Sequence, residues 1–147
     1  MSARTSRPGG RPARATVLAG GALVAALTAT AWYGWLGRDH EYQVDPVTGA
    51  VSGPYEAWQV AGCVLSLLAL ALAAGVLLRP LVPLAVVPPA FTVAWSVDAA
   101  AHDESGLWAV GAVMLLFGLV LGAAAVTGVT TPLHDRVTRR RLGTAAG

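Results

Sequence analysis

The chain has 147 residues, enough for one domain, and a formal net charge of +2. Apolar residues make up 55% of it and charged residues only 12%, about half the charged share of an ordinary soluble domain. So little charge could not cover the surface of a soluble globular protein, and the composition indicates a protein whose solvent is lipid.

Four long apolar stretches follow one another along the chain and carry charge only at their edges. They cover roughly 16–36, 57–78, 81–97 and 107–128. An α-helix rises 1.5 Å per residue, so about 20 residues cross a hydrocarbon core of about 30 Å. The sequence therefore predicts an all-α integral membrane four-helix bundle over 16–129. Basic tails occupy 1–15 and 130–147, and we expect disorder over 1–14 and 136–147.

Charged and aromatic residues predict how this bundle is oriented. Nine of the ten arginines precede the first stretch, lie between the second and third, or follow the fourth, and only Arg38 lies on the other side. Cytoplasmic loops retain arginine, so both termini are expected in the cytoplasm, an N-in/C-in topology. Seven of the eight acids and all tryptophans and tyrosines fall at or beyond the opposite ends of the stretches, in agreement with this orientation.

The first stretch has two interpretations. Its apolar run over 17–27, followed by Ala29-Thr30-Ala31, resembles a secretory signal with an A-x-A cleavage site, and cleavage would leave three spans. However, the stretch continues through 32–36 to spanning length, and bulky aromatic residues follow the cleavage site directly. We therefore expect a retained first helix, and loss of about thirty residues from the purified protein would contradict this.

The first outer loop, 37–56, contains the turn sequence VDPVTGAV over 44–51. Asp45 can accept hydrogen bonds from the amides that follow it, Pro46 presets its own φ, and Gly49 supplies a positive φ. The sequence predicts a short β-hairpin over the outer face of the bundle.

Polar residues of the second and third stretches gather toward the outer side of the membrane. The set comprises Gln59, Cys63, Ser66, Thr92, Ser96, Asp98 and His102. Polar groups in lipid are costly unless they face one another or water. We expect either a shallow polar pocket open to the outside or interhelical hydrogen bonds that bind no ligand.

Two histidines and two carboxylates on the outer side could hold a metal ion or relay a proton. If the third helix continues past Val97, Asp98 and His102 lie at i and i+4 and can hydrogen-bond. With His40 and Asp103 they offer ligands of the kind that bind Zn²⁺, although topology alone also collects such residues in outer loops.

Small residues of the fourth stretch share one helical face. They are Gly111, Gly118, Gly122 and Ala125, and they include a GxxxG motif. Such a face lets helices approach closely, either between two copies of the chain or within one bundle. The third stretch contains Pro83, Pro88 and Pro89, which predict a kink near its middle, either static or acting as a hinge.

No enzyme or cofactor motif occurs in the chain. GxSxG, HExxH and glycine-rich phosphate loops are missing, and the single cysteine excludes CxxC sites and an intramolecular disulfide. We expect no cofactor and no nucleic-acid binding, because the basic residues lie at the two ends of the chain. The leading hypothesis is a non-enzymatic accessory or structural subunit that contacts lipid, other membrane proteins or a second copy. The alternative is a small transporter or ion-coupled carrier that uses the outer pocket.

The chain has no Lys, Asn or Ile. Their codons are AT-rich, so their absence indicates a GC-rich bacterial genome. With the segment DPVTG over 45–49 and GPYEAWQ over 53–59, it resembles the small uncharacterised four-span integral membrane proteins of high-GC actinobacteria. The resemblance implies a bacterial plasma membrane location and carries no activity or site residue.

Overall fold

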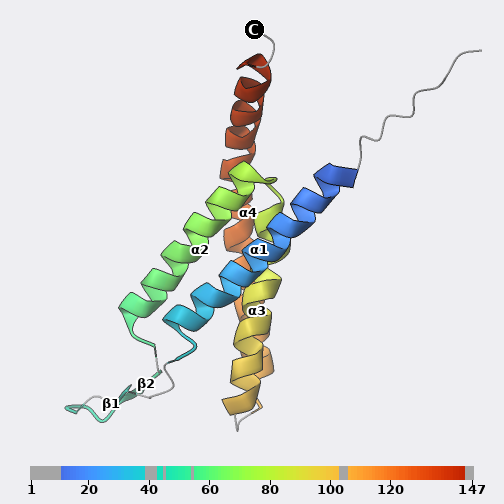
Figure 1. Cartoon of the computed structure of the whole chain (residues 1–147). Coiled ribbons are helices and arrows are strands. Elements are labelled where there is room, and N and C mark those ends of the chain that lie inside the picture. The colour runs from blue at the N-terminus through green and yellow to red at the C-terminus, as the bar shows by residue number, and fades with distance from the viewer. Residues whose placement is uncertain (1–10, 39–42, 45, 54, 103–105, 145–147) are drawn as a thin grey trace, which may run out of the picture.

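A computed structural model of the chain describes the backbone of residues 11–38, 43–44, 46–53, 55–102 and 106–144 (Figure 1). Four α-helices make up most of it. They are α1 Arg11–Trp35, α2 Ala57–Leu77, α3 Val82–His102 and α4 Trp108–Thr144. All four are long and apolar enough to span a membrane, which confirms the predicted helical membrane architecture.

Three helices extend beyond the stretches that predicted them. α1 begins at Arg11, α3 runs on from Val97 to His102, and α4 runs on from 128 to Thr144, which makes α4 about 55 Å long at 37 residues. The expected disorder is therefore wrong over 11–14 and 136–144. Hydropathy marks the part of a helix that suits lipid, whereas backbone hydrogen bonding continues as long as the following residues tolerate it.

The helices pack in the cyclic order α1, α2, α4, α3, and α2 also touches α3 across the bundle. α1 and α4 do not contact each other in the described part of the chain. In Figure 1, α1 and α2 run side by side and cross the α3–α4 pair. The α3 helix is continuous through Pro88 and Pro89, whereas Pro83 lies in its first turn, where proline is tolerated.

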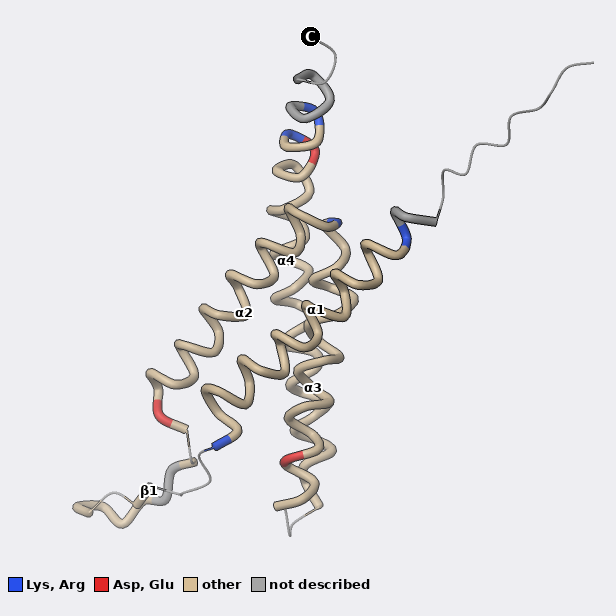
Figure 2. The backbone as a smooth tube through the Cα atoms, viewed as in Figure 1, with Lys and Arg blue, Asp and Glu red and all other residues tan. Residues whose placement is uncertain are grey.

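Charged residues mark the two ends of the bundle (Figure 2). Basic residues at the start of α1, in the α2–α3 connection and in the last turns of α4 lie together at what we call the arginine end. It comprises Arg14, Arg79, Arg136 and Arg139. The opposite end, which we call the tryptophan end, holds the last turns of α1 and α3 and the first turns of α2 and α4.

Two very short strands lie between α1 and α2. They are β1 Gln43–Val44 and β2 Val51–Ser52, paired antiparallel with Val44 opposite Val51. Gly49 adopts φ +68° in the turn between them. Two residue pairs are too few for an independently stable hairpin, so the hairpin over the outer face stays a prediction.

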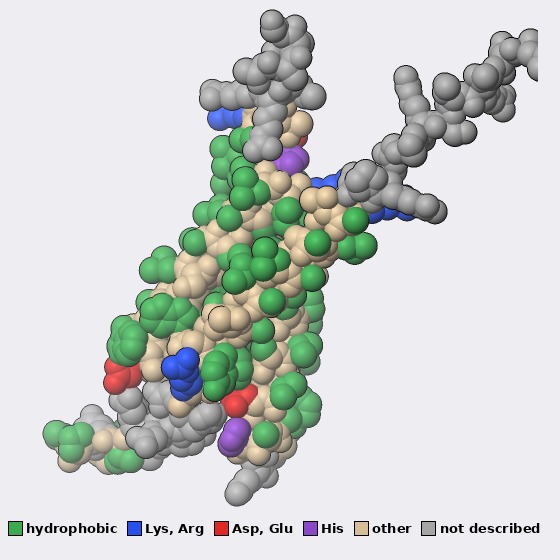
Figure 3. Space-filling model, viewed as in Figure 1, with side chains coloured by type: hydrophobic (Ala, Val, Ile, Leu, Met, Phe, Trp, Pro, Cys, Tyr) green, Lys and Arg blue, Asp and Glu red, His purple; other side chains and the backbone are tan. Residues whose placement is uncertain are grey.

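Apolar side chains cover the outside of the bundle as well as its core. The buried core includes Val24, Leu67 and Phe91, while Met114 and Leu121 of α4 are each more than two-thirds exposed. Figure 3 shows hydrophobic side chains spread over the visible helical surface. Soluble proteins rarely expose apolar surface on this scale, and the distribution fits a protein surrounded by lipid.

Candidate functional site

A hydrogen bond joins α1 to α2 at the tryptophan end. The Trp35 indole Nε1 donates to Ser66 Oγ at 3.0 Å, and Ser66 Oγ donates to the Gly62 carbonyl at 2.8 Å. A Cβ on Gly62 would lie 2.6 Å from the Trp35 ring, so the glycine lets the indole reach Ser66. Trp35 also packs edge-on against Trp58 with ring centroids 6.1 Å apart. Ser66 therefore makes an interhelical hydrogen bond, one of the two roles predicted for the polar set.

Gln59 and Cys63 support the first turns of α2. Gln59 Oε1 accepts a hydrogen bond from the Glu56 amide at 2.7 Å as half of a capping box. Cys63 is 2% exposed and belongs to the hydrophobic core, as is usual for a lone cysteine. Both residues have a role in the fold that requires no ligand.

Thr92 and Ser96 lie half-buried on α3. The Thr92 hydroxyl is buried and, within the described residues, has no hydrogen-bond partner, and the same holds for the indole nitrogen of Trp32 on α1. An unsatisfied buried polar group costs roughly 1–3 kcal/mol. The Thr92 hydroxyl and the Trp32 indole N–H could therefore each make a hydrogen bond that the described part of the bundle does not supply.

Asp98 and His102 meet one turn apart, because α3 continues past Val97. His102 Nδ1 lies 2.9 Å from the Asp98 carbonyl oxygen and 3.5 Å from the carboxylate Oδ1. The His102 side chain is 58% exposed. The Asp98 side chain is 21% exposed, so the contact lies at the edge of the bundle with His102 on its outer side.

The remaining members of the predicted metal or proton site, His40 and Asp103, lie outside the described residues. Among the side chains that the structure does describe, no three of His, Cys, Asp or Glu form a group that could hold a metal ion. The common outer pocket and the metal site both stay predictions.

The small residues of α4 separate into two groups. Gly111 faces α3, where an added Cβ would lie 2.9 Å from the Trp95 ring. Gly118 and Gly122 would place an added Cβ within 4 Å of no described atom, and Ala125 is exposed. Packing within the chain therefore accounts for Gly111 and leaves the GxxxG face of α4 uncovered.

At the arginine end, α4 is hydrogen-bonded to the last turn of α2 and to the α2–α3 connection by residues that the sequence did not single out. His134 Nδ1 donates to the Val76 carbonyl at 2.8 Å, and Thr127 Oγ1 lies 3.1 Å from the Pro80 carbonyl oxygen. Thr130 is fully buried. Thr127, Thr130 and His134 have offsets of 0, 3 and 7, the spacing of one helical face, and this signal could have identified them.

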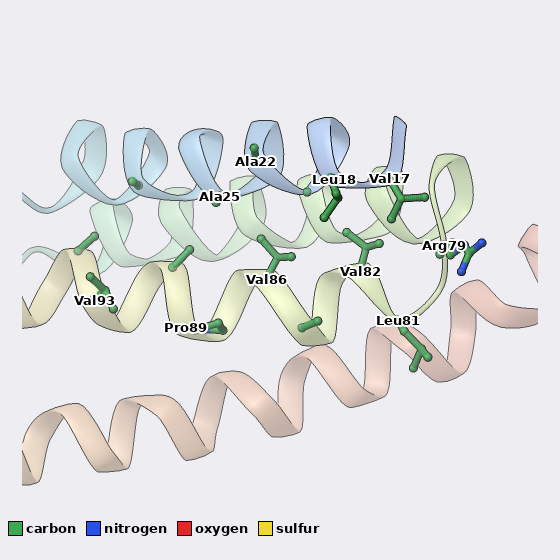
Figure 4. Close-up of a pocket in the computed structure, with 15 residues that line it drawn as sticks. Val17, Leu18, Ala22, Ala25, Arg79, Leu81, Val82, Val86, Pro89 and Val93 are labelled. Carbon is green, nitrogen blue, oxygen red and sulfur yellow. The ribbon is translucent and has the colours of Figure 1, made fainter. Parts of the chain in front are cut away.

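A groove of about 930 Å³ runs between α1 and α3 (Figure 4). Glycine and alanine form most of its α1 wall beyond Leu18, and its α3 wall alternates between alanine and bulkier apolar residues. The lining includes Gly21, Ala25 and Ala29 on α1 and Val86, Pro89 and Val93 on α3. The four-residue spacing of the small residues on α1 was visible in the sequence, but only the partner helix shows that they leave a hollow.

The groove has one charged lining residue, Arg79 in the α2–α3 connection at the arginine end. Arg79 is exposed, and no carboxylate pairs with it among the described residues. Arg14 precedes the lining residues Val17 and Leu18 by three and four positions, so it lies on the same face of α1, one turn beyond the groove. The groove therefore has an apolar body and a basic mouth.

The chemistry of this groove is limited to binding. Its lining contains no acid, histidine, cysteine, serine or threonine that could act as a nucleophile or general base. None of the residues of the polar set at the tryptophan end lines it, although the lining residues Val93 and Ala94 lie between Thr92 and Ser96 on α3.

Comparison with known proteins assigns no family to the chain. No family model matches it, and no curated protein or solved structure matches it either.

Proposed function

We propose that the chain is a non-enzymatic accessory or structural subunit of the bacterial plasma membrane that acts through lateral contacts with another membrane helix. The observation that carries this proposal is the uncovered face of α4, where Gly118 and Gly122 are exposed and a Cβ added to either would meet no described side chain within 4 Å.

The composition of this face suits a helical partner. Gly118, Gly122 and Ala125 form a small-residue stripe, and Met114 and Leu121 beside it are 72% and 71% exposed. In lipid, helices associate through close packing, and small residues let two backbones approach while larger neighbours interdigitate. The face offers both a shallow strip and flanking side chains to a second helix.

The polar residues argue for a non-catalytic role. Ser66 and Gln59 are engaged in hydrogen bonds that hold α1 to α2 or cap α2, and Asp98 contacts the exposed His102 on its own helix. A catalytic site needs several polar groups converging on one substrate position. The described contacts of these residues are explained by the fold.

We place the arginine end in the cytoplasm, with both chain termini on that side. The arginine distribution supports this orientation through the retention of basic segments in the cytoplasm, and the tryptophans at the opposite end supply an interfacial belt. The loop with β1 and β2 then faces the outside, where the turn sequence favours a short hairpin.

Cysteine cross-linking in native membranes tests the lateral contact. In a Cys63→Ala background, we expect Gly118→Cys and Gly122→Cys each to give a covalent species larger than the 15.0 kDa chain. The matched control is Val113→Cys, which is also exposed on α4 but lies on a different side of the helix. Cross-linking equal at all three positions, or none at the two glycines, would contradict the proposal.

A further inference from the structure

We infer that the α1–α3 groove binds one anionic phospholipid from the leaflet at the arginine end. One acyl chain lies along the apolar body of the groove, and the phosphate is held at its mouth by the Arg79 and Arg14 guanidinium groups. This goes beyond the proposed function, which concerns a helix partner on α4. The lipid site lies between α1 and α3, on a different side of the bundle.

The length of the groove is close to the thickness of one leaflet. On α3 the lining extends from Val82 to Ala94, which at 1.5 Å per residue is about 18 Å. Half of a hydrocarbon core of about 30 Å is about 15 Å. The groove therefore begins at the membrane boundary and extends a few ångströms past the midplane, a length that one acyl chain can fill. Its volume of about 930 Å³ lies within the usual range of ligand sites, roughly 300–1,000 Å³.

The charges at the mouth select an anionic headgroup. Guanidinium groups bind phosphate oxygens through charge-assisted, often bidentate, hydrogen bonds. A zwitterionic headgroup also carries a positively charged ammonium, which two neighbouring guanidinium groups repel. Among the described residues, Asp135 on α4 is the acid of the arginine end, and it is not part of the groove lining. The mouth thus offers Arg79 and Arg14 to a phosphate and no described acid to an ammonium.

A transmembrane helix fits this groove less well than an acyl chain. Gly21, Ala25 and Ala29 have the small-residue spacing that helix pairs use. However, a spanning helix needs a continuous seam across the membrane, and the hollow stops at Ala29 and Ala94. If a helix of a second copy occupies the groove, the inference is therefore overturned.

Native mass spectrometry of the full chain in detergent tests the headgroup. The probes are phosphatidylglycerol and phosphatidylcholine with identical acyl chains. We expect one phosphatidylglycerol to be retained, and Arg79→Gln to weaken its binding about tenfold or more, because a hydrogen bond to a charged group is lost. Arg139→Gln, at the same end but on α4 and outside the lining, is the matched control and should bind as the unmodified chain does.

A second pair of variants tests the acyl chain. Ala85→Leu adds bulk to an exposed position in the groove lining, and Ala124→Leu adds the same bulk to an exposed position on α4. We expect only Ala85→Leu to reduce phosphatidylglycerol retention, with thermal stability unchanged in both. The inference is overturned if the two lipids are retained equally, if Arg139→Gln acts like Arg79→Gln, or if Ala85→Leu has no effect. It is also overturned if Ala22→Cys in the Cys63→Ala background cross-links two copies, or if sn-glycerol 3-phosphate alone displaces the lipid.

Discussion

Gly75 of α2 lies directly against the side chain of Thr130 on α4. A Cβ added to Gly75 would lie 2.7 Å from the Thr130 hydroxyl oxygen and 2.9 Å from its Cβ and Cγ2. Thr130 is fully buried and β-branched, so its side chain has no free space to enter. The pair therefore sets how closely α2 and α4 approach at the arginine end.

Gly75→Ala should destabilise this helix pair. Forcing an extra methyl into a filled contact costs typically about 1–3 kcal/mol. Thermal unfolding in detergent measures the loss. Gly128→Ala is the control, because an added Cβ there meets nothing within 4 Å of the described atoms. Equal melting temperatures for the two variants would show that Gly75 and Thr130 are not in close contact in the detergent-solubilised protein.

His134→Ala should loosen the end of α2. The imidazole donates to the Val76 carbonyl, which lies in the last turn of α2, where carbonyls lack helical partners. Its loss should cost about 1 kcal/mol. Hydrogen exchange of amides in the last turn of α2 and in the α2–α3 connection should accelerate. His102→Ala, an exposed histidine at the opposite end, should leave these amides unchanged.

The Trp35–Ser66 hydrogen bond can be measured with a double-mutant cycle. Trp35→Phe keeps an aromatic ring but removes the donor, and Ser66→Ala removes the acceptor. Interhelical hydrogen bonds in membrane proteins contribute about 0.6 kcal/mol on average, so the coupling free energy should be near that value. A coupling of zero would mean that the two groups do not interact in the membrane.

Asp98→Asn should change the free energy of unfolding by less than about 1 kcal/mol, because asparagine keeps a side-chain oxygen toward His102 and the His102 side chain is 58% exposed. Cross-linking through Gly118→Cys should be unaffected, since Asp98 lies on α3 and away from the uncovered α4 face. Proteoliposomes give the opposing test. A solute or proton flux carried by the unmodified chain and abolished by Asp98→Asn would replace the accessory role with that of a carrier.

Hydropathy alone was sufficient to locate the helices. The second span was expected over 57–78 and is Ala57–Leu77, because a run of apolar residues without charge has no stable alternative to a helix in lipid. The same signal could not find the end of α4. Its segment after 128 is polar and still helical, since Thr130 and His134 dock it onto α2.

The contacts between helices could not be predicted from the sequence. The small residues Gly62, Gly75 and Gly118 look alike in a periodic pattern, yet the first receives the Trp35 ring, the second meets Thr130 and the third is uncovered. Which role each takes depends on the rotation of its helix against a neighbour. The α1–α3 groove was missed for the same reason, because a hollow belongs to a pair of helices and not to one.

The orientation of the chain in the membrane underlies the whole account, and cysteine labelling tests it most directly. In the Cys63→Ala background, Ala50→Cys lies in the loop between α1 and α2, and Thr138→Cys lies in the part of α4 at the arginine end. A membrane-impermeant maleimide applied to intact cells should label Ala50→Cys and should reach Thr138→Cys only after the membrane is permeabilised. Labelling of Thr138→Cys in intact cells, with Ala50→Cys protected, would contradict the account.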